Sequence, residues 1–563
     1  MVQKFLLLIK KESTGIAQAA IVLGLFAFLS QILGFVRDRL LAHFIGPSAT
    51  LDMYYAAFRI PDFLFVSIAS LVSIVALVPF LSQFEKETVS EQHIKTKEFI
   101  SHVFWGFLIL LLVVGCLVFF LMPYIVQITA PGFLPEAKRT IVMLSRILLL
   151  SPLFLGLSNV LGSVSQSKKR FIAFSLSPII YNVGIIVGIV FFYPTWGIVG
   201  LVFGVSLGAL LHFLLQTFVV GHMGLLPVFK IPKLSVIKQV VTLSIPRTAG
   251  LALANLTTTA LLAIASYLAE GSISIFSFAV ILQAVPLSII GVSFSVAAFP
   301  TLASCYAKND IDGFLAHTTS AARQIIFWSL PAAALFVVLR AHIVRIILGT
   351  GRFTWIDTRL VAACLAVFVV SVAAQGLVLL YVRAFYAAQK TWRPLIANAL
   401  ASLFTIGSAF FCLHFMNTHP EIKTSIEMFL RIQSVPKTEV IALAFSFSLG
   451  ACLNAFVLWI LFESTFGSWK RGILLARTFL ESGIGAVIVG TVTYGVLYLV
   501  APYRDNTTLL GVVIQGGLAG FVGVSIGGMF LYLIGNIECL SFVQALHTRF
   551  WKKTVALPEQ GDM

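Results

Sequence analysis

Residues 30–62, SQILGFVRDRLLAHFIGPSATLDMYYAAFRIPD, place charged side chains inside two long apolar segments. The charged residues are Arg37, Asp38, Arg39, Asp52, Arg59 and Asp62. A charge at the centre of a bilayer costs roughly 3 kcal/mol or more unless it is paired or hydrated. We therefore expect these side chains to have partners or a function that offsets this cost.

The composition of the whole chain indicates that these segments lie in a membrane. The chain has 563 residues, of which 59% are hydrophobic and 11% charged, and its mean hydropathy is +1.00. Apolar runs near or above the ~20 residues that cross a bilayer recur along it. The sequence therefore predicts an all-α polytopic membrane protein with about fourteen transmembrane helices.

Basic residues set the expected orientation. With the N-terminus in the cytoplasm, most of the lysines and arginines outside the spans lie on the cytoplasmic side, as the positive-inside bias requires. Both termini are then expected in the cytoplasm. The net charge of +16 follows from this topology and from contact with anionic lipid, so no nucleic-acid partner is expected.

A long-range repeat of prolines and their neighbours predicts the domain organisation. The matched positions are Pro61 with Pro286, and Pro178 and Asn182 in SPIIYN with Pro394 and Asn398 in RPLIAN. Prolines are common in membrane helices, so chance is the alternative, but the Pro-x-x-x-Asn match repeats a spacing as well as a residue type. We predict two six-helix lobes in parallel repeat, residues 1–221 and 222–464. Two further transmembrane helices at 465–540 and a cytoplasmic tail at 541–563 follow.

The charged residues of the second span share one face with a tyrosine. Positions three or four apart lie on the same side of a helix. The stripe consists of Asp52, Tyr55, Arg59 and Asp62. Pro61 lacks the N–H that would bond the carbonyl of Ala57, so the helix is expected to kink beside Arg59. A kinked helix that carries an arginine suits a binding cavity.

Arginines from both lobes are expected to line this cavity. Arg247 follows Pro246 at the start of the second lobe, as Arg37 and Arg59 lie in the first. Clustered guanidinium groups favour an anionic ligand, and their bidentate geometry favours phosphate. The sequence thus predicts a phosphate-bearing amphiphile as substrate. The alternative is that the arginines reach the headgroups or pair with Asp38 or Asp62 as internal structure.

Catalytic chemistry has little support in the sequence, and neither an enzyme activity nor a metal or cofactor is expected. The sequence contains no nucleotide-binding phosphate loop and no Gly-x-Ser-x-Gly motif. GTGRF at residues 349–353 lacks the Lys-Ser/Thr of a phosphate loop, so an ordinary turn is expected. Transport must then draw on a sodium or proton gradient, on the membrane potential or on the gradient of the substrate, and these alternatives stay open.

Several segments resemble the bacterial lipid II flippases of the MurJ (MviN) family, within the multidrug/oligosaccharidyl-lipid/polysaccharide exporter superfamily. They are LGFVRDRLLAHFIGPSATLDMYYAAFRIPDF at 33–63, EGSISIFSFAVILQAVPLSIIGVSFSVAAFPTLA at 270–303, LRAHIVRIILGTGRF at 339–353 and VRAFYAAQKTWRP at 382–394. The resemblance implies fourteen helices, a central cationic cavity and a groove for an undecaprenyl tail along the last two helices. It also implies alternating access that carries lipid II to the outer leaflet of the bacterial inner membrane.

The resemblance also implies partners and site residues. The partners are lipid II, or a similar undecaprenyl-pyrophosphate-linked saccharide, and the lipid bilayer, with a monomeric transporter expected. The residues at matching family positions are Arg37, Asp38, Asp52 and Arg59. Other basic family positions are replaced here, for example by Gln31 and Ile281. We therefore hypothesise that Arg59 and Arg247 take over the phosphate role, supported by Arg37, with Asp38, Asp52 and Asp62 in the same site.

Three other functions remain as alternatives. The first is export of another polyprenyl-linked saccharide, and the second is a membrane scaffold without transport. The third is export of cationic drugs, which would require unpaired acids rather than arginines in the cavity. The scaffold does not explain why charged side chains are kept inside apolar segments at such a cost.

Overall fold

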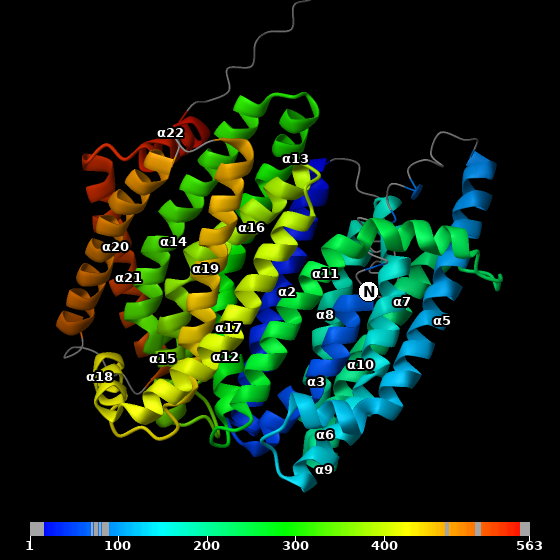
Figure 1. Ribbon diagram of the computed structural model, residues 1–563, viewed down its shortest axis with the longest axis horizontal. Helices are drawn as coiled ribbons and strands as arrows, with labels where there is room; N and C mark the ends of the chain where they lie inside the picture. The colour runs from blue at the N-terminus through cyan, green and yellow to red at the C-terminus, as the bar shows by residue number, and fades with distance from the viewer. Residues whose placement is uncertain are drawn as a thin grey trace, which may run out of the picture. The chain divides into compact units, whose positions relative to one another are not determined.

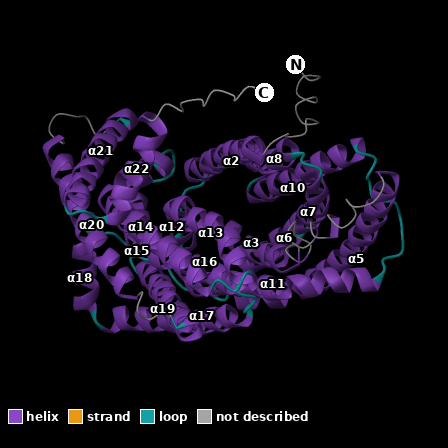
Figure 2. Cartoon of the chain, turned by 90° about the horizontal axis from the view of Figure 1, so that it is seen from above, coloured by secondary structure: helices purple, strands orange, loops and turns teal. Residues whose placement is uncertain are grey.

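The computed structural model describes residues 16–68, 71, 77, 80–81, 89–467, 472–500 and 508–551. The second expected span, both ends of the chain and part of the expected C-terminal tail are thus only partly described. Within these ranges the regular structure is helical, without strands (Figure 2). In the first half of the chain (Figure 1) the helices are α2 (Ile16–Phe44), α3 (Ala49–Ile68), α5 (Val89–Thr129), α6 (Pro135–Leu148), α7 (Leu150–Ser167), α8 (Phe171–Val187), the π-helical η3 (Gly188–Phe192), α9 (Tyr193–Trp196), α10 (Ile198–His222) and α11 (Leu234–Ala265).

The second half continues with the same kind of element. Its helices are α12 (Ser272–Pro286), the π-helical η4 (Leu287–Val292), α13 (Ser293–Ala307), α14 (Ile311–Leu348), α15 (Trp355–Val370), α16 (Val372–Ala387), α17 (Trp392–Thr418), α18 (Pro420–Leu430), α19 (Val440–Phe466), α20 (Gly472–Val500), α21 (Leu509–Leu533) and α22 (Ile537–Trp551).

Long apolar helices confirm that the chain crosses a membrane many times. Among the described residues, 11 helices are long and apolar enough to span a bilayer, or 12 if α15 and α16, which meet at 46°, form one broken span. The helices that carry the charged stretch, α2 and α3, are not among them, and each contains three Asp or Arg residues. The total of fourteen spans therefore stays a prediction.

The chain divides into two compact units. One contains Met1–Ile281, Ile347–Cys364 and Thr391–Gly450, and the other contains Leu282–Ile346, Leu365–Lys390 and Ala451–Met563. Their boundaries do not coincide with the predicted lobe boundaries at residues 221 and 464. The division into two six-helix lobes stays a prediction.

Glycines bring helices of the first unit close together. In this unit α10 packs along α7 and α8, and α2 packs along α8 (Figure 2). A Cβ atom added to Gly184 would lie 2.2 Å from the Cα of Gly208, and one added to Gly188 would lie 2.5 Å from the Cα of Gly204. Small residues allow such backbone approach in membranes, where packing rather than water exclusion holds helices together. The same glycines fix α8, which contacts α2 beside Arg37.

The turn between α2 and α3 packs against the GTGRF segment, which is a turn, as expected. Gly46 and Gly351 both have positive φ, at 67° and 58°, a conformation that glycine adopts without strain. The backbone N–H of Arg352 donates to the carbonyl of His43 at 3.0 Å. A Cβ atom on Gly46 would lie 2.9 Å from the carbonyl oxygen of Arg352, so the two turns fit only with glycine here.

The second unit has a similar close approach beside a proline. The π-helical η4 follows directly after Pro286, where the regular hydrogen-bond ladder changes register. A Cβ atom on Gly291 would lie 2.8 Å from the Cα of Gly376 in α16. Because neither glycine has a side chain, η4 and α16 can approach closely at this point.

Candidate functional site

Arg37 is held on two sides by hydrogen bonds. Its Nε donates to Oδ1 of Asp38 at 2.9 Å, its Nη2 lies 2.9 Å from the same oxygen, and its Nη1 donates to Oδ1 of Asn182 at 3.2 Å. The amide of Asn182 in turn donates to the carbonyl of Pro178 at 3.1 Å. These contacts join α2 to α8 and fix the guanidinium while leaving its side chain 26% exposed.

Asp38 is the buried partner in this pair. The residue is 2% exposed, and its second oxygen, Oδ2, has no hydrogen-bond partner among the described residues. A charge in a membrane interior is tolerated when an opposite charge accompanies it. The pair with Arg37 therefore explains how both residues remain in the apolar segment.

Arg59 is less engaged than Arg37. Its Nε donates to the carbonyl of Tyr55 at 3.2 Å. Within the part of the chain that the structure describes, this is the only hydrogen bond of Arg59, and it forms no ion pair. Both terminal nitrogens of its guanidinium therefore remain available to a ligand. Asp62, one turn further on, lies close enough to Arg37 and Arg59 to interact with both charges.

The carbonyl released by Pro61 has a partner from another helix. Ser145 of α6 donates its hydroxyl to the carbonyl of Ala57 at 3.1 Å, and Ser145 is 1% exposed. The sequence predicted that Pro61 frees this carbonyl, but it did not indicate the donor. The hydroxyl satisfies a buried acceptor that would otherwise cost about 1–3 kcal/mol.

Asp52 caps the start of α12. Its Oδ2 accepts from the backbone N–H of Gly271 at 2.6 Å, and its Oδ1 accepts from the backbone N–H and the hydroxyl of Ser274, the former at 2.8 Å. A carboxylate at a helix N-terminus satisfies free N–H groups and complements the helix dipole. Because Asp52 is 4% exposed and both oxygens are occupied, the structure gives it a positioning role.

All six expected site residues belong to the same compact unit. Arg37, Asp38, Asp52, Arg59 and Asp62 all belong to α2 and α3. Arg247 lies in α11, which packs against α3, and its side chain is outside the described residues. Residues of the stripe on α3 therefore have different roles. Asp52 accepts hydrogen bonds from the start of α12, whereas the terminal nitrogens of Arg59 have no hydrogen-bond partner among the described residues.

Sequence reasoning missed two members of this site. Asn182 drew attention only as part of the repeated SPIIYN motif, and its contact with Arg37 could not be read from spacing. Ser145 lies in an otherwise ordinary segment. The sequence does indicate that such partners are needed, because a carbonyl freed by a proline and an arginine inside a membrane each require a polar partner from elsewhere in the chain. It does not indicate which residues they are.

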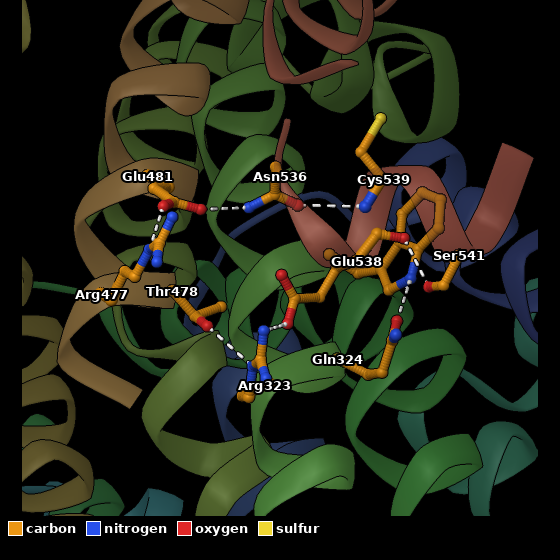
Figure 3. Close-up of polar contacts among 10 residues, drawn as sticks. Arg323, Gln324, Arg477, Thr478, Glu481, Asn536, Glu538, Cys539 and Ser541 are labelled. Carbon is orange, nitrogen blue, oxygen red and sulfur yellow. Dashed lines mark hydrogen bonds and ion pairs between the residues drawn. The ribbon is translucent and has the colours of Figure 1, made fainter. Parts of the chain in front are cut away.

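The second unit has a polar cluster of its own, shown in Figure 3. Arg323 of α14 points at Glu538 of α22, with Nη2 and Oε1 2.6 Å apart, and its Nε donates to the hydroxyl of Thr478 at 3.0 Å. Asn536 donates to Oε2 of Glu481 at 2.8 Å. The cluster joins α14, α20 and the segment that leads into α22, and it was not predicted.

Comparisons of this sequence with protein families and with individual proteins agree with each other. The family model described as lipid II flippase MurJ matches residues 41–514. The chain is 27% identical to the probable lipid II flippase MurJ of Buchnera aphidicola subsp. Schizaphis graminum (strain Sg), over 73% of this chain and 80% of that protein. It is 25% identical to the lipid II flippase MurJ of Burkholderia cenocepacia, over 81% of this chain and 84% of that protein.

Solved structures resemble the fold. A lipid II flippase MurJ in an inward closed conformation matches with a TM-score of 0.69 and 22% identity, over 91% of this chain and all of that one. An inward-facing multidrug resistance transporter of the MATE family and the MOP superfamily matches with a TM-score of 0.62 and 13% identity, over 78% of this chain and 96% of that one. These likenesses support the helical fold expected from the sequence.

Proposed function

The chain belongs to the MurJ lipid II flippase family, and we propose that it carries lipid II from the inner to the outer leaflet of the bacterial inner membrane by alternating access. The observation that carries the proposal is the match of the family model to residues 41–514, which include the arginines of α3 and α11. Flippases and transporters move their substrate without chemical conversion, so no catalytic residue is required.

Arg59 is the residue we assign to the pyrophosphate. Its two terminal nitrogens have no partner among the described residues, and a guanidinium can donate both to phosphate oxygens at once. Arg37 supports this role by its positive charge, although Asp38 neutralises part of it. Arg247 is the third cation of the proposal, since α11 packs along α3.

Charge balance then links binding to conformational change. In the empty site Asp62 offsets some of the charge of Arg59, and a bound pyrophosphate would add negative charge that draws the arginines together. A ligand can shift a conformational equilibrium only by its difference in affinity for the two states. We propose that the pyrophosphate binds more tightly to the state that is closed on the cytoplasmic side, and that its release outside restores the empty state.

The energy source of this cycle follows from the charge of the substrate. A membrane potential that is negative inside favours outward movement of an anion by roughly 2.3 kcal/mol per charge per 100 mV. The potential alone therefore gives the transport a direction. Dependence of transport on a sodium or proton gradient is tested by collapsing each gradient separately.

The test is translocation of labelled lipid II in vesicles, together with rescue of cells depleted of their own flippase. Loss of a charged bidentate contact costs about 1.5–3 kcal/mol, so Arg59→Ala should lower translocation about 10- to 150-fold while the protein is still made and inserted. Arg247→Ala should fail in the same way. Arg39→Ala is the matched control. It removes an arginine of the same charged stretch that is not assigned to the substrate and that donates instead to the carbonyl of Ile347 at 3.3 Å. Normal translocation by Arg59→Ala and Arg247→Ala would overturn the assignment.

A further inference from the structure

An open cavity of about 970 Å³ lies between α5 and α6, and none of its lining residues belongs to α2 or α3. Its size is at the upper end of the ~300–1,000 Å³ of ordinary ligand pockets. Phe119, Pro123 and Met143 form part of its apolar wall. Lys138, Arg139 and Arg146 also line it, and no acidic residue does.

Arg146 is fixed at the wall of this cavity by a proline. Pro123 lacks the N–H that would bond the carbonyl of Phe119, and the Nε of Arg146 donates to that carbonyl at 3.0 Å. The guanidinium carbon also lies 4.5 Å from the centroid of the Phe119 ring. Both contacts orient the side chain, and its terminal nitrogens form no hydrogen bond within the described ranges.

The other two cations differ in how they are held. Lys138 donates to the carbonyl of Pro131 at 2.7 Å, in the turn between the two helices. Arg139 is exposed and has no hydrogen bond or ion pair among the described residues. Three positive charges at one cavity, one of them unengaged, are complementary to a phosphate group.

The cavity lies beside a row of exposed apolar side chains. On α5, one of the candidate spans, the residues next to the cavity wall are Phe120, Tyr124 and Ile128, which are 68%, 68% and 76% exposed. They follow one another at intervals of four and so form a stripe along the helix. Because α5 is long and apolar enough to span a bilayer, we expect these side chains to contact acyl chains. A ligand in the cavity can therefore keep its hydrocarbon in the membrane.

We propose that this cavity binds the headgroup of an anionic phospholipid, with the phosphate beside Arg139 and Arg146 and an acyl chain along the exposed stripe of α5. On the predicted orientation this lipid belongs to the outer leaflet. The proposal does not depend on the identity of the transported substrate, and its readout is lipid retention rather than translocation. The class of ligand follows from the cations and from the membrane-facing apolar wall together.

The experiment uses the full-length purified protein in mild detergent with equal amounts of phosphatidylglycerol and phosphatidylcholine of the same acyl chains. Native mass spectrometry measures the retained lipid, and the acetylation rate of Lys138 reports on the cavity itself. We expect phosphatidylglycerol to be retained preferentially and to slow acetylation of Lys138, whereas phosphatidylcholine should not. Arg139→Gln should lower phosphatidylglycerol retention about five-fold, the effect of one basic residue near an anionic lipid.

Two controls separate this site from general electrostatic binding. Arg139→Lys keeps the charge and should keep retention, and Lys308→Gln removes an exposed cation at the end of α13 and should leave retention unchanged. Equal retention of the two lipids, an equal loss in Lys308→Gln, or unchanged acetylation of Lys138 with phosphatidylglycerol would each overturn the proposal. Displacement of the lipid by inorganic phosphate would also overturn it, because the site would then select the free ion.

Discussion

The contact between Asp52 and the start of α12 distinguishes a positioning residue from a substrate ligand. Asp52→Asn keeps the size and one acceptor oxygen, but it places an amide N–H₂ where a carboxylate oxygen accepts from a backbone N–H. One charge-assisted hydrogen bond is worth about 1.5–3 kcal/mol, and the donor left without an acceptor lies in a buried site. We expect the unfolding equilibrium to shift by about 10- to 150-fold.

Asp52→Ala should cost more than Asp52→Asn, because it leaves two backbone donors without an acceptor. Ser274→Ala is the matched control, since it removes only the hydroxyl and both backbone bonds remain. Reversible unfolding in SDS measures the stability, and lipid II translocation is divided by the amount of folded protein. A positioning role predicts normal translocation per folded molecule. If Asp52→Asn is as stable as the wild type but does not transport, the cap is wrong and Asp52 contacts the substrate.

Three further predictions follow from buried or paired groups. Ser145→Ala should destabilise the protein by about 1 kcal/mol. The same substitution should have no effect in the Pro61→Ala background, because alanine restores the N–H that the carbonyl of Ala57 lacks. Additive effects of the two substitutions in a double-mutant cycle would refute this. Glu538→Gln should cost about 1.5–3 kcal/mol in SDS unfolding, because it removes the counter-charge of Arg323, whose side chain is only 18% exposed. Arg477→Gln, at an exposed arginine, should leave the unfolding midpoint almost unchanged, and equal shifts in the two variants would contradict the difference in burial. Burial opposes ionisation of Glu439, but Lys423, 2.6 Å away, holds the pKa of this carboxyl below its ordinary value. The pair should therefore stabilise the protein at any pH above the ordinary glutamate pKa. This stabilisation should be lost as the pH falls through the lowered pKa of the folded protein. Unfolding rates of wild type and Glu439→Gln should therefore differ at pH 7 and converge in acid, and a constant difference would contradict the pairing.

Local physics explains which features the sequence could predict. Hydropathy and helix length predict a multi-pass helical protein, and the covalent structure of proline predicts a free carbonyl at Ala57 without reference to the fold. The positive φ of Gly351 agrees with the turn expected for GTGRF. Each of these inferences depends on a few neighbouring residues.

Long-range partners could not be predicted in the same way. Asp52 and Ser274 are 222 residues apart, and Arg37 and Asn182 are 145 apart, so only the packing of helices decides that they meet. The charged residues of the stripe on α3 are all predicted to lie in one substrate site, because spacing shows which side chains share a face. It does not show what that face contacts, and Asp52 and Arg59 have different neighbours for this reason.

The short helix α6 replaces donors that two prolines remove from its neighbours. Ser145 donates to the carbonyl four residues before Pro61 in α3, and Arg146 donates to the carbonyl four residues before Pro123 in α5. In a membrane no water can take the place of these donors, so separating α6 from α3 would leave a buried acceptor unsatisfied. The hydrogen bond therefore favours movement of α3 and α6 as one body during transport. A hinge that changes the position of the arginine on α3 is then expected outside this contact, at the turn between α2 and α3.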